Sequence, residues 1–204
     1  ITADMVTYPN VLTMTGDITI EGWYYASNLS GANLGFFGNS TVYGDSEIYL
    51  QYYSGNLYLK YGDVYINAAS GMSSGQWYHI AAVRSSGVTK FYLNGVANST
   101  TYTDTNDYGT TSPLTIGSAG DNPGAASNFH NGYISNLRVV SGTAVYTAAF
   151  TPPTSPLTAI TNTALLCNMT NGAIYDNAMI PDYRTVGNAQ ISTSQKKFGS
   201  GSLS

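Results

Sequence analysis

A polar loop in the second half of the chain contains the residues best suited to bind a metal ion. Residues 120–131 read GDNPGAASNFHN and place Asp121, Asn122 and Asn128 close together in the sequence. Carboxylate and amide oxygens are the hard ligands that calcium prefers. We therefore treat calcium as a candidate ion for this loop. The alternative is a solvated loop whose Asn, Asp and Gly residues satisfy turn geometry.

Calcium would need a second carboxylate, because Asp121 is the only acidic residue of this loop. Asp45 and Asp107 lie in other polar segments and are the candidates to supply it. The predicted metal ligands are therefore Asp121, Asn122, Asp45 and Asp107.

Aromatic side chains at two places are candidates for sugar binding. Phe129 and His130 follow the polar loop, and their rings can stack on a sugar. A tyrosine-rich stretch, residues 49–65, contains Tyr49 and Tyr58 as further candidates, because exposed tyrosines bind sugars or proteins at a low cost in conformational entropy. The alternative for this stretch is that the tyrosines form cross-strand pairs that only stabilise a sheet.

The sequence contains no arrangement of residues typical of an enzyme. Glycoside hydrolysis needs two carboxylates at a fixed separation, but Glu21 and Glu47 are the only glutamates. Asp17 and Glu21 would lie roughly 13 Å apart on one face of a strand, which is too far for a retaining pair. His79 and His130 lack metal-ligand spacing, and no serine is expected to form a nucleophile elbow. We expect no enzymatic activity.

The composition favours a protein outside the cell. The formal net charge is -4 and only 9% of the residues are charged, so a nucleic-acid partner is not expected. Abundant Ser, Thr, Asn and Gly with 18 tyrosines are typical of extracellular or virion-exposed β-proteins. No apolar run is long enough to span a membrane, and the single cysteine, Cys167, cannot form an internal disulfide.

Alternating apolar and polar residues predict an all-β chain. The clearest case is residues 75–96, where two half-buried strands flank Ser85-Ser86-Gly87 and the dipeptide Asn94-Gly95 predicts a second, type I′ turn. Residues 97–111 are polar with scattered aromatic residues, and residues 144–149 are the only segment whose sequence allows one helical turn.

Several of these segments together resemble the laminin-G-like domain of the concanavalin A-like jelly-roll family. The resemblance rests on GQWYHIAAVRSSGVTKFYLNGV (75–96), on GDITIEGWYY (16–25) and on NGYISNLRVVSGTAVYTAAFTPPTSPL (131–157). It implies an antiparallel jelly-roll β-sandwich with calcium or sugar held on loops at its rim. It also implies that Trp77, His79 and Arg84 belong to the scaffold. The Pro-rich segment and the tail more narrowly resemble repeated modules of bacteriophage structural and tail-fibre proteins.

The resemblance also suggests how the chain divides. Residues 1–150 are expected to form the sandwich, residues 151–161 a Pro-rich tether, and residues 162–204 the terminal strands of the same sandwich or of a neighbouring copy. The expected function is a non-enzymatic module on a virion surface or outside the cell, a decoration protein or tail-fibre adhesin that binds cell-surface glycan. The alternatives are a structural subunit that assembles by exchange of its C-terminal strands and, less favoured, a secreted glycan-degrading enzyme.

Overall fold

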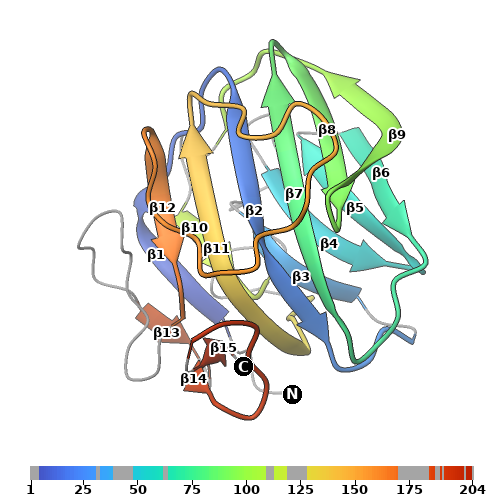
Figure 1. Cartoon of the computed structure of the whole chain (residues 1–204), viewed down its shortest axis with the longest axis vertical. Helices are drawn as coiled ribbons and strands as arrows, with labels where there is room; N and C mark the ends of the chain where they lie inside the picture. The colour runs from blue at the N-terminus through green and yellow to red at the C-terminus, as the bar shows by residue number, and fades with distance from the viewer. Residues whose placement is uncertain are drawn as a thin grey trace.

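The protein is a sandwich of two antiparallel β-sheets (Figure 1). This is seen in a computed structural model that describes residues 5–30, 33–38, 48–61, 64–108, 113–118, 128–169, 184–186, 189, 191–199 and 201–203. The predicted all-β jelly-roll class is therefore confirmed. No described residue lies in a helix, so residues 144–149 do not form the helical turn that their sequence allowed. Nor does any described segment form a helix long and apolar enough to cross a membrane.

The first sheet has the strand order β13-β1-β10-β3-β4-β5-β6. Its strands are β1 (Met5–Val11), β3 (Asn33–Gly38), β4 (Ile48–Tyr53), β5 (Asn56–Tyr61), β6 (Val64–Ser70), β10 (Pro113–Ile116) and β13 (Arg184–Val186).

The second sheet has the order β14-β15-β11-β2-β7-β8-β9, and β12 pairs with β11 beside that path. Its strands are β2 (Ile18–Ala26), β7 (Trp77–Ser85), β8 (Val88–Leu93), β9 (Val96–Thr103), β11 (Gly132–Ser141), β12 (Thr163–Cys167), β14 (Ile191–Ser192) and β15 (Ser202–Leu203). Strand β9 includes the first part of the polar segment 97–111, for which the sequence predicted no strand. Its side chains are mostly exposed because it is the edge strand, so they lack the apolar alternation of a half-buried strand.

Two-residue turns set the register of the hairpins. Asn94-Gly95 has φ values of 50° and 78°, and φ is also positive at both residues of Ser54-Gly55 (47° and 89°) and Ser86-Gly87 (49° and 77°). Positive φ at both central residues is the requirement of a type I′ turn, whose twist matches that of the flanking strands. The turn predicted at Asn94-Gly95 is therefore confirmed.

A segment without regular secondary structure covers the outer face of the eight-stranded sheet. Residues 142–160, which we call the strap, cross β11, β2, β7 and β8 on that face (Figure 1). Ala144, Tyr146 and Phe150 of the strap pack against Ala81, Val83 and Tyr92. Strand β7 is consequently buried on both faces from Tyr78 to Arg84, whereas its alternation predicted a half-buried strand.

The C-terminal residues pair within their own chain. Leu203 of β15 lies opposite Ile134 of β11, and β13 pairs with β1. The ammonium nitrogen of Lys197 lies 3.8 Å from the ring centroid of Trp23, and the ring of Phe198 meets the same indole edge-on. Whether these strands complete this sandwich or that of a neighbouring copy in solution stays a prediction, as does the division of the chain into three parts.

Candidate functional site

Three of the four predicted metal ligands, Asp121, Asn122 and Asp45, lie outside the described residues. Among the residues that the structure does describe, no group of three or more His, Cys, Asp or Glu side chains could hold a metal ion. Calcium binding therefore stays a prediction.

Asp107 and Asn128 lie at opposite ends of the sandwich. Asp107 precedes Tyr108, which bridges to Met14 just before β2 begins, whereas Ser27, just after β2 ends, donates to the carbonyl of Asn131. Nine residues of β2 separate the two ends by roughly 26 Å. An ion bound beside Asn128 would therefore not have Asp107 as a ligand.

The ring of His130 is occupied by packing contacts. Its centroid lies 5.0 Å from that of Phe36, and its Nε2 lies 3.1 Å from the carbonyl oxygen of Tyr25. Burial lowers the pKa of His130 to about 4, against the smaller effect of its backbone hydrogen bonds. Asn128 accepts from the amide of Gly35, and Phe129 bridges to Ser118, so these residues fasten the loop to the sheets. We therefore assign His130 to the scaffold.

The tyrosine-rich stretch forms a continuous surface on the outer face of β4, β5 and β6. Cross-strand register aligns Tyr49, Lys60 and Tyr65 in one row and Gln51, Tyr58 and Asn67 in the next. A third row begins with Tyr53 and Asn56. Intervening residues such as Leu50 and Leu59 point into the core. We call the surface formed by Tyr49, Gln51, Tyr53, Asn56, Tyr58, Lys60, Tyr65 and Asn67 the tyrosine face.

The rings of the tyrosine face hold one another in fixed orientations. The hydroxyls of Tyr49 and Tyr65 are 2.9 Å apart, and the ring of Tyr65 meets those of Tyr49 and Tyr58 edge-on. Lys60 is only 1% exposed because its ammonium lies 5.2 Å and 5.7 Å from the ring centroids of Tyr49 and Tyr65. Tyr65 and Tyr53 nevertheless remain about half exposed, at 51% and 50%.

The chemistry of the tyrosine face suits a sugar chain. Three strands and three rows of residues give an area of roughly 10 Å by 13 Å. Aromatic rings offer apolar surface for the faces of sugar rings, and the amides of Gln51, Asn56 and Asn67 offer donors and acceptors for hydroxyls. Tyr49 and Tyr58, which the sequence singled out, are thus brought together with Tyr65. The contributions of Lys60, Gln51 and Asn67 were missed, and the signal that could have found them is the same period-two alternation continued through β6.

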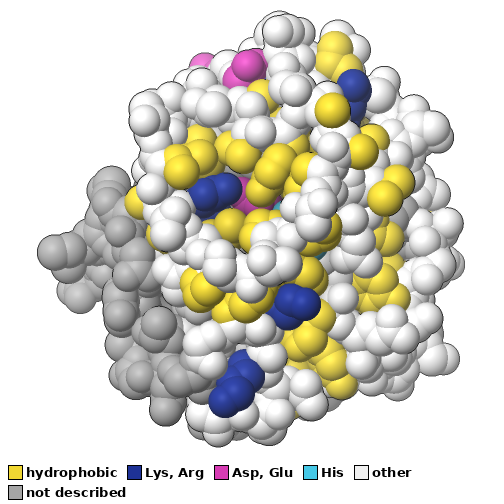
Figure 2. Space-filling view, in the orientation of Figure 1, with side chains coloured by type: hydrophobic (Ala, Val, Ile, Leu, Met, Phe, Trp, Pro, Cys, Tyr) yellow, Lys and Arg dark blue, Asp and Glu magenta, His cyan; other side chains and the backbone are white. Residues whose placement is uncertain are grey.

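The carboxylate of Glu21 is enclosed by a network that the sequence did not reveal. Its Oε1 accepts from Nε and Nη2 of Arg138, and its Oε2 accepts from the hydroxyl of Tyr146 at 2.8 Å and lies 3.2 Å from Nε2 of His79. Burial alone would raise the pKa of Glu21, but the His79 hydrogen bond and the Arg138 charge outweigh it and keep that pKa below its ordinary value. Figure 2 shows basic and acidic side chains together in a hollow on the outer face of the eight-stranded sheet, between hydrophobic side chains. Burial and the Glu21 charge raise the pKa of Tyr146.

Comparison with solved structures supports the fold. A heptameric SAP-like pentraxin from Limulus polyphemus is 15% identical, with a TM-score of 0.60 over 91% of this chain and 89% of its own. A protein from Bacteroides ovatus ATCC 8483, whose name describes it as a candidate carbohydrate-binding protein, is also 15% identical, with a TM-score of 0.62 over 92% of this chain and 59% of its own. The extracellular region of zebrafish Gpr126/Adgrg6 has a TM-score of 0.56 at 15% identity, over 89% of this chain and 24% of its own.

Comparison with curated proteins gives no match. The sequence itself matches one family model, described as the concanavalin A-like lectin/glucanases superfamily, over residues 2–151. This match covers the two sheets from β1 to β11, together with the start of the strap. The chain therefore belongs to the concanavalin A-like lectin/glucanases superfamily.

Proposed function

We propose that this protein binds glycan through its tyrosine face, as a non-enzymatic module outside the cell or on a virion surface, where it acts as an adhesin or decoration protein. The observation that carries the proposal is the placement of Tyr49, Tyr58 and Tyr65 on the outer face of three adjacent strands, beside amide side chains. Membership of a superfamily of lectins and glucanases supports a carbohydrate ligand.

Binding without hydrolysis is supported by the burial and the hydrogen bonds of the Glu21 carboxylate. Its carboxylate is fully buried and both oxygens are engaged, so it has neither access to a glycosidic bond nor a raised pKa for acid catalysis. The tyrosine face itself contains aromatic, amide and ammonium groups and no carboxylate among its eight residues.

A glycan array followed by calorimetric titration of the best ligand tests the proposal. Tyr65→Ala removes a half-exposed ring of the tyrosine face and should weaken binding about tenfold. The matched control is Tyr133→Ala, because Tyr133 is a partly buried tyrosine on the other sheet whose ring meets Tyr25. Equal affinity of the Tyr65→Ala variant and the parent protein, or no bound glycan on a broad array, would refute the proposal.

A second function is favoured by the pairing of the C-terminal strands. Strand β15 has two residues and pairs with β11 at one position, Ile134 opposite Leu203. So short a pairing is easily released, and a released strand can add its main-chain groups to the sheet of another chain. The second candidate is therefore a structural subunit that assembles by exchange of these strands.

A further inference from the structure

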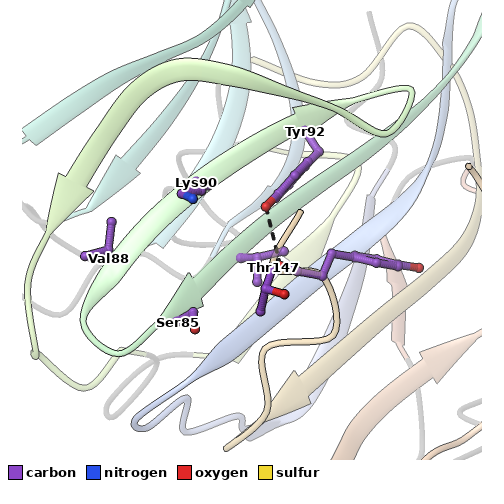
Figure 3. A pocket seen from close by; sticks show the side chains of 7 residues that line it. Ser85, Val88, Lys90, Tyr92 and Thr147 are labelled. Atoms are coloured by element: carbon purple, nitrogen blue, oxygen red, sulfur yellow. Dashed lines mark hydrogen bonds between the residues drawn. The ribbon is translucent and has the colours of Figure 1, made fainter. Parts of the chain in front are cut away.

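The outer face of the eight-stranded sheet contains an open pocket at the edge of the strap (Figure 3). It lies on the sheet opposite to the tyrosine face and has a volume of about 220 Å³. Its lining residues are Val83, Ser85, Val88, Lys90, Tyr92, Tyr146 and Thr147. The floor is the β7–β8 hairpin, in which Val83 lies opposite Lys90 and Ser85 lies opposite Val88.

The wall of the pocket is fixed before any ligand arrives. The amide of Val145 donates to Thr19 Oγ1, the hydroxyl of Tyr146 donates to Glu21, and the amide of Phe150 donates to the carbonyl of Gly95. The rings of Tyr146 and Phe150 also stack, with centroids 3.6 Å apart. A preformed wall lowers the entropy that a small ligand must lose on binding.

The lining combines three kinds of chemistry around this small volume. Val83 and Val88 present branched apolar side chains, and Ser85 and Thr147 present hydroxyls from the hairpin and from the strap. Lys90 is exposed and is the one charged residue among the lining residues. This lining is complementary to a ligand with an apolar face, hydroxyls and one negative charge.

The charge of the whole chain makes this lysine significant. The chain carries a formal net charge of -4, which repels anionic ligands in general. An acidic group also lies on the hairpin turn, because the carboxylate of Asp17 accepts from the amide of Ser86, beside the lining residue Ser85. At physiological ionic strength charges more than about 8 Å apart are largely screened, so Lys90, as the one charged lining residue, acts most directly on a ligand in the pocket. The pocket therefore selects for a ligand with an anionic group, held by the ammonium of Lys90.

We propose that this pocket is a second saccharide site, specific for a single sugar ring that carries a carboxylate, of the hexuronate type. The apolar face of the ring lies on Val83 and Val88, its hydroxyls reach Ser85 and Thr147, and its carboxylate pairs with Lys90. The site is independent of the tyrosine face, because the two lie on different sheets.

Titration with trigalacturonate and, separately, with the neutral galactotriose tests this site. The parent protein should bind the acidic trisaccharide, and Lys90→Gln should weaken that binding about tenfold or more, since one charge-assisted hydrogen bond is lost. Lys90→Arg should retain most of the affinity. Lys196→Gln is the matched control, because Lys196 is an exposed lysine of the C-terminal segment outside the pocket.

The Tyr65→Ala variant separates this site from the tyrosine face. If it loses neutral glycan binding and keeps trigalacturonate binding, the two sites are distinct as proposed. Thr147→Trp, which fills the pocket from its exposed wall, should abolish trigalacturonate binding without affecting neutral glycans. Unchanged trigalacturonate affinity in both Lys90→Gln and Thr147→Trp would overturn the inference, whatever happens at the tyrosine face.

Discussion

Glu21 of β2 and Arg138 of β11 form a buried ion pair directly opposite each other on adjacent strands. Nε of Arg138 donates to Oε1 of Glu21 at 2.9 Å, and the exposed fractions of the two side chains are 6% for Arg138 and 0% for Glu21. Arg138 also donates to the carbonyl of Thr158. The pair thus links the sheet to the segment that lies across it.

Removal of one partner of this pair should be strongly destabilising. Arg138→Met leaves the Glu21 carboxylate buried without its counterion, so the free energy of unfolding should fall by about 3–5 kcal/mol. Urea denaturation measures the change. The double variant Glu21→Gln/Arg138→Met should lose clearly less than the sum of the two single variants, because it buries no uncompensated charge. Additive losses would contradict this account of the network.

Gly95 should be the glycine of the hairpin turns that is least tolerant of a side chain. Its φ is +78°, and an added Cβ would lie 1.8 Å from the carbonyl oxygen of Phe150 in the strap. Gly95→Ala should therefore lower the free energy of unfolding by about 2 kcal/mol or more. Gly55→Ala is the matched control, since Gly55 also has positive φ but has no atom within 4 Å of such a Cβ. Similar losses in the two variants would show that the strap does not touch the turn.

The two glycines also illustrate which features the sequence could predict. Local rules apply at Ser54-Gly55 and Asn94-Gly95, because a two-residue turn depends only on neighbouring residues. The contact of Gly95 with Phe150 joins residues far apart in the chain, and no periodicity encodes it. The strap was missed for the same reason, and with it the burial of both faces of β7 and the enclosure of Glu21.

The tyrosine face lies between these two cases. Alternation correctly singled out Tyr49 and Tyr58 as residues of paired strands, because both lie in one hairpin. The placement of Lys60 beside Tyr65 follows a register that runs unshifted from the Tyr61–Val64 pair to the Tyr58–Asn67 pair, and the irregularity lies beyond it, between Leu57 and Tyr58. The sequence cannot reveal such a shift, but the shift affects only the third row, so continuing the period-two alternation through β6 could have predicted the first two rows.

His130 should make the stability of the protein pH-dependent in a defined window. Its pKa is about 4 in the folded protein and about 6.5 when unfolded, so the unfolded chain binds more protons between these values. The stabilisation is complete above pH 6.5 and is lost as the pH falls toward 4, by at most about 3 kcal/mol. The lowered pKa of Glu21 affects the pH dependence of stability only below the ordinary value of that pKa, near 4.5.

Urea denaturation between pH 7 and pH 4 measures this dependence. His130→Gln removes the titrating ring, so its free energy of unfolding should vary less with pH across the window, although the variant is less stable overall because it loses the contact with Phe36. An unchanged slope in the variant would mean that His130 does not titrate with a lowered pKa.

Leu203 should report whether the C-terminal strands complete their own sandwich. The side chain is 5% exposed in the main core, and Leu203→Ala should lower the free energy of unfolding by about 2–3 kcal/mol. Val96→Ala is the control, since Val96 is 68% exposed and its truncation should change stability by about 0.5 kcal/mol at most.

If β15 pairs within its own chain, the loss of stability in Leu203→Ala is the same at every protein concentration. If β15 is exchanged between copies, the midpoint of unfolding rises with protein concentration in the parent protein, because mass action stabilises the assembly, and Leu203→Ala weakens the assembly as well. Denaturation of both proteins over a hundredfold range of concentration, followed by sedimentation, decides between the two arrangements.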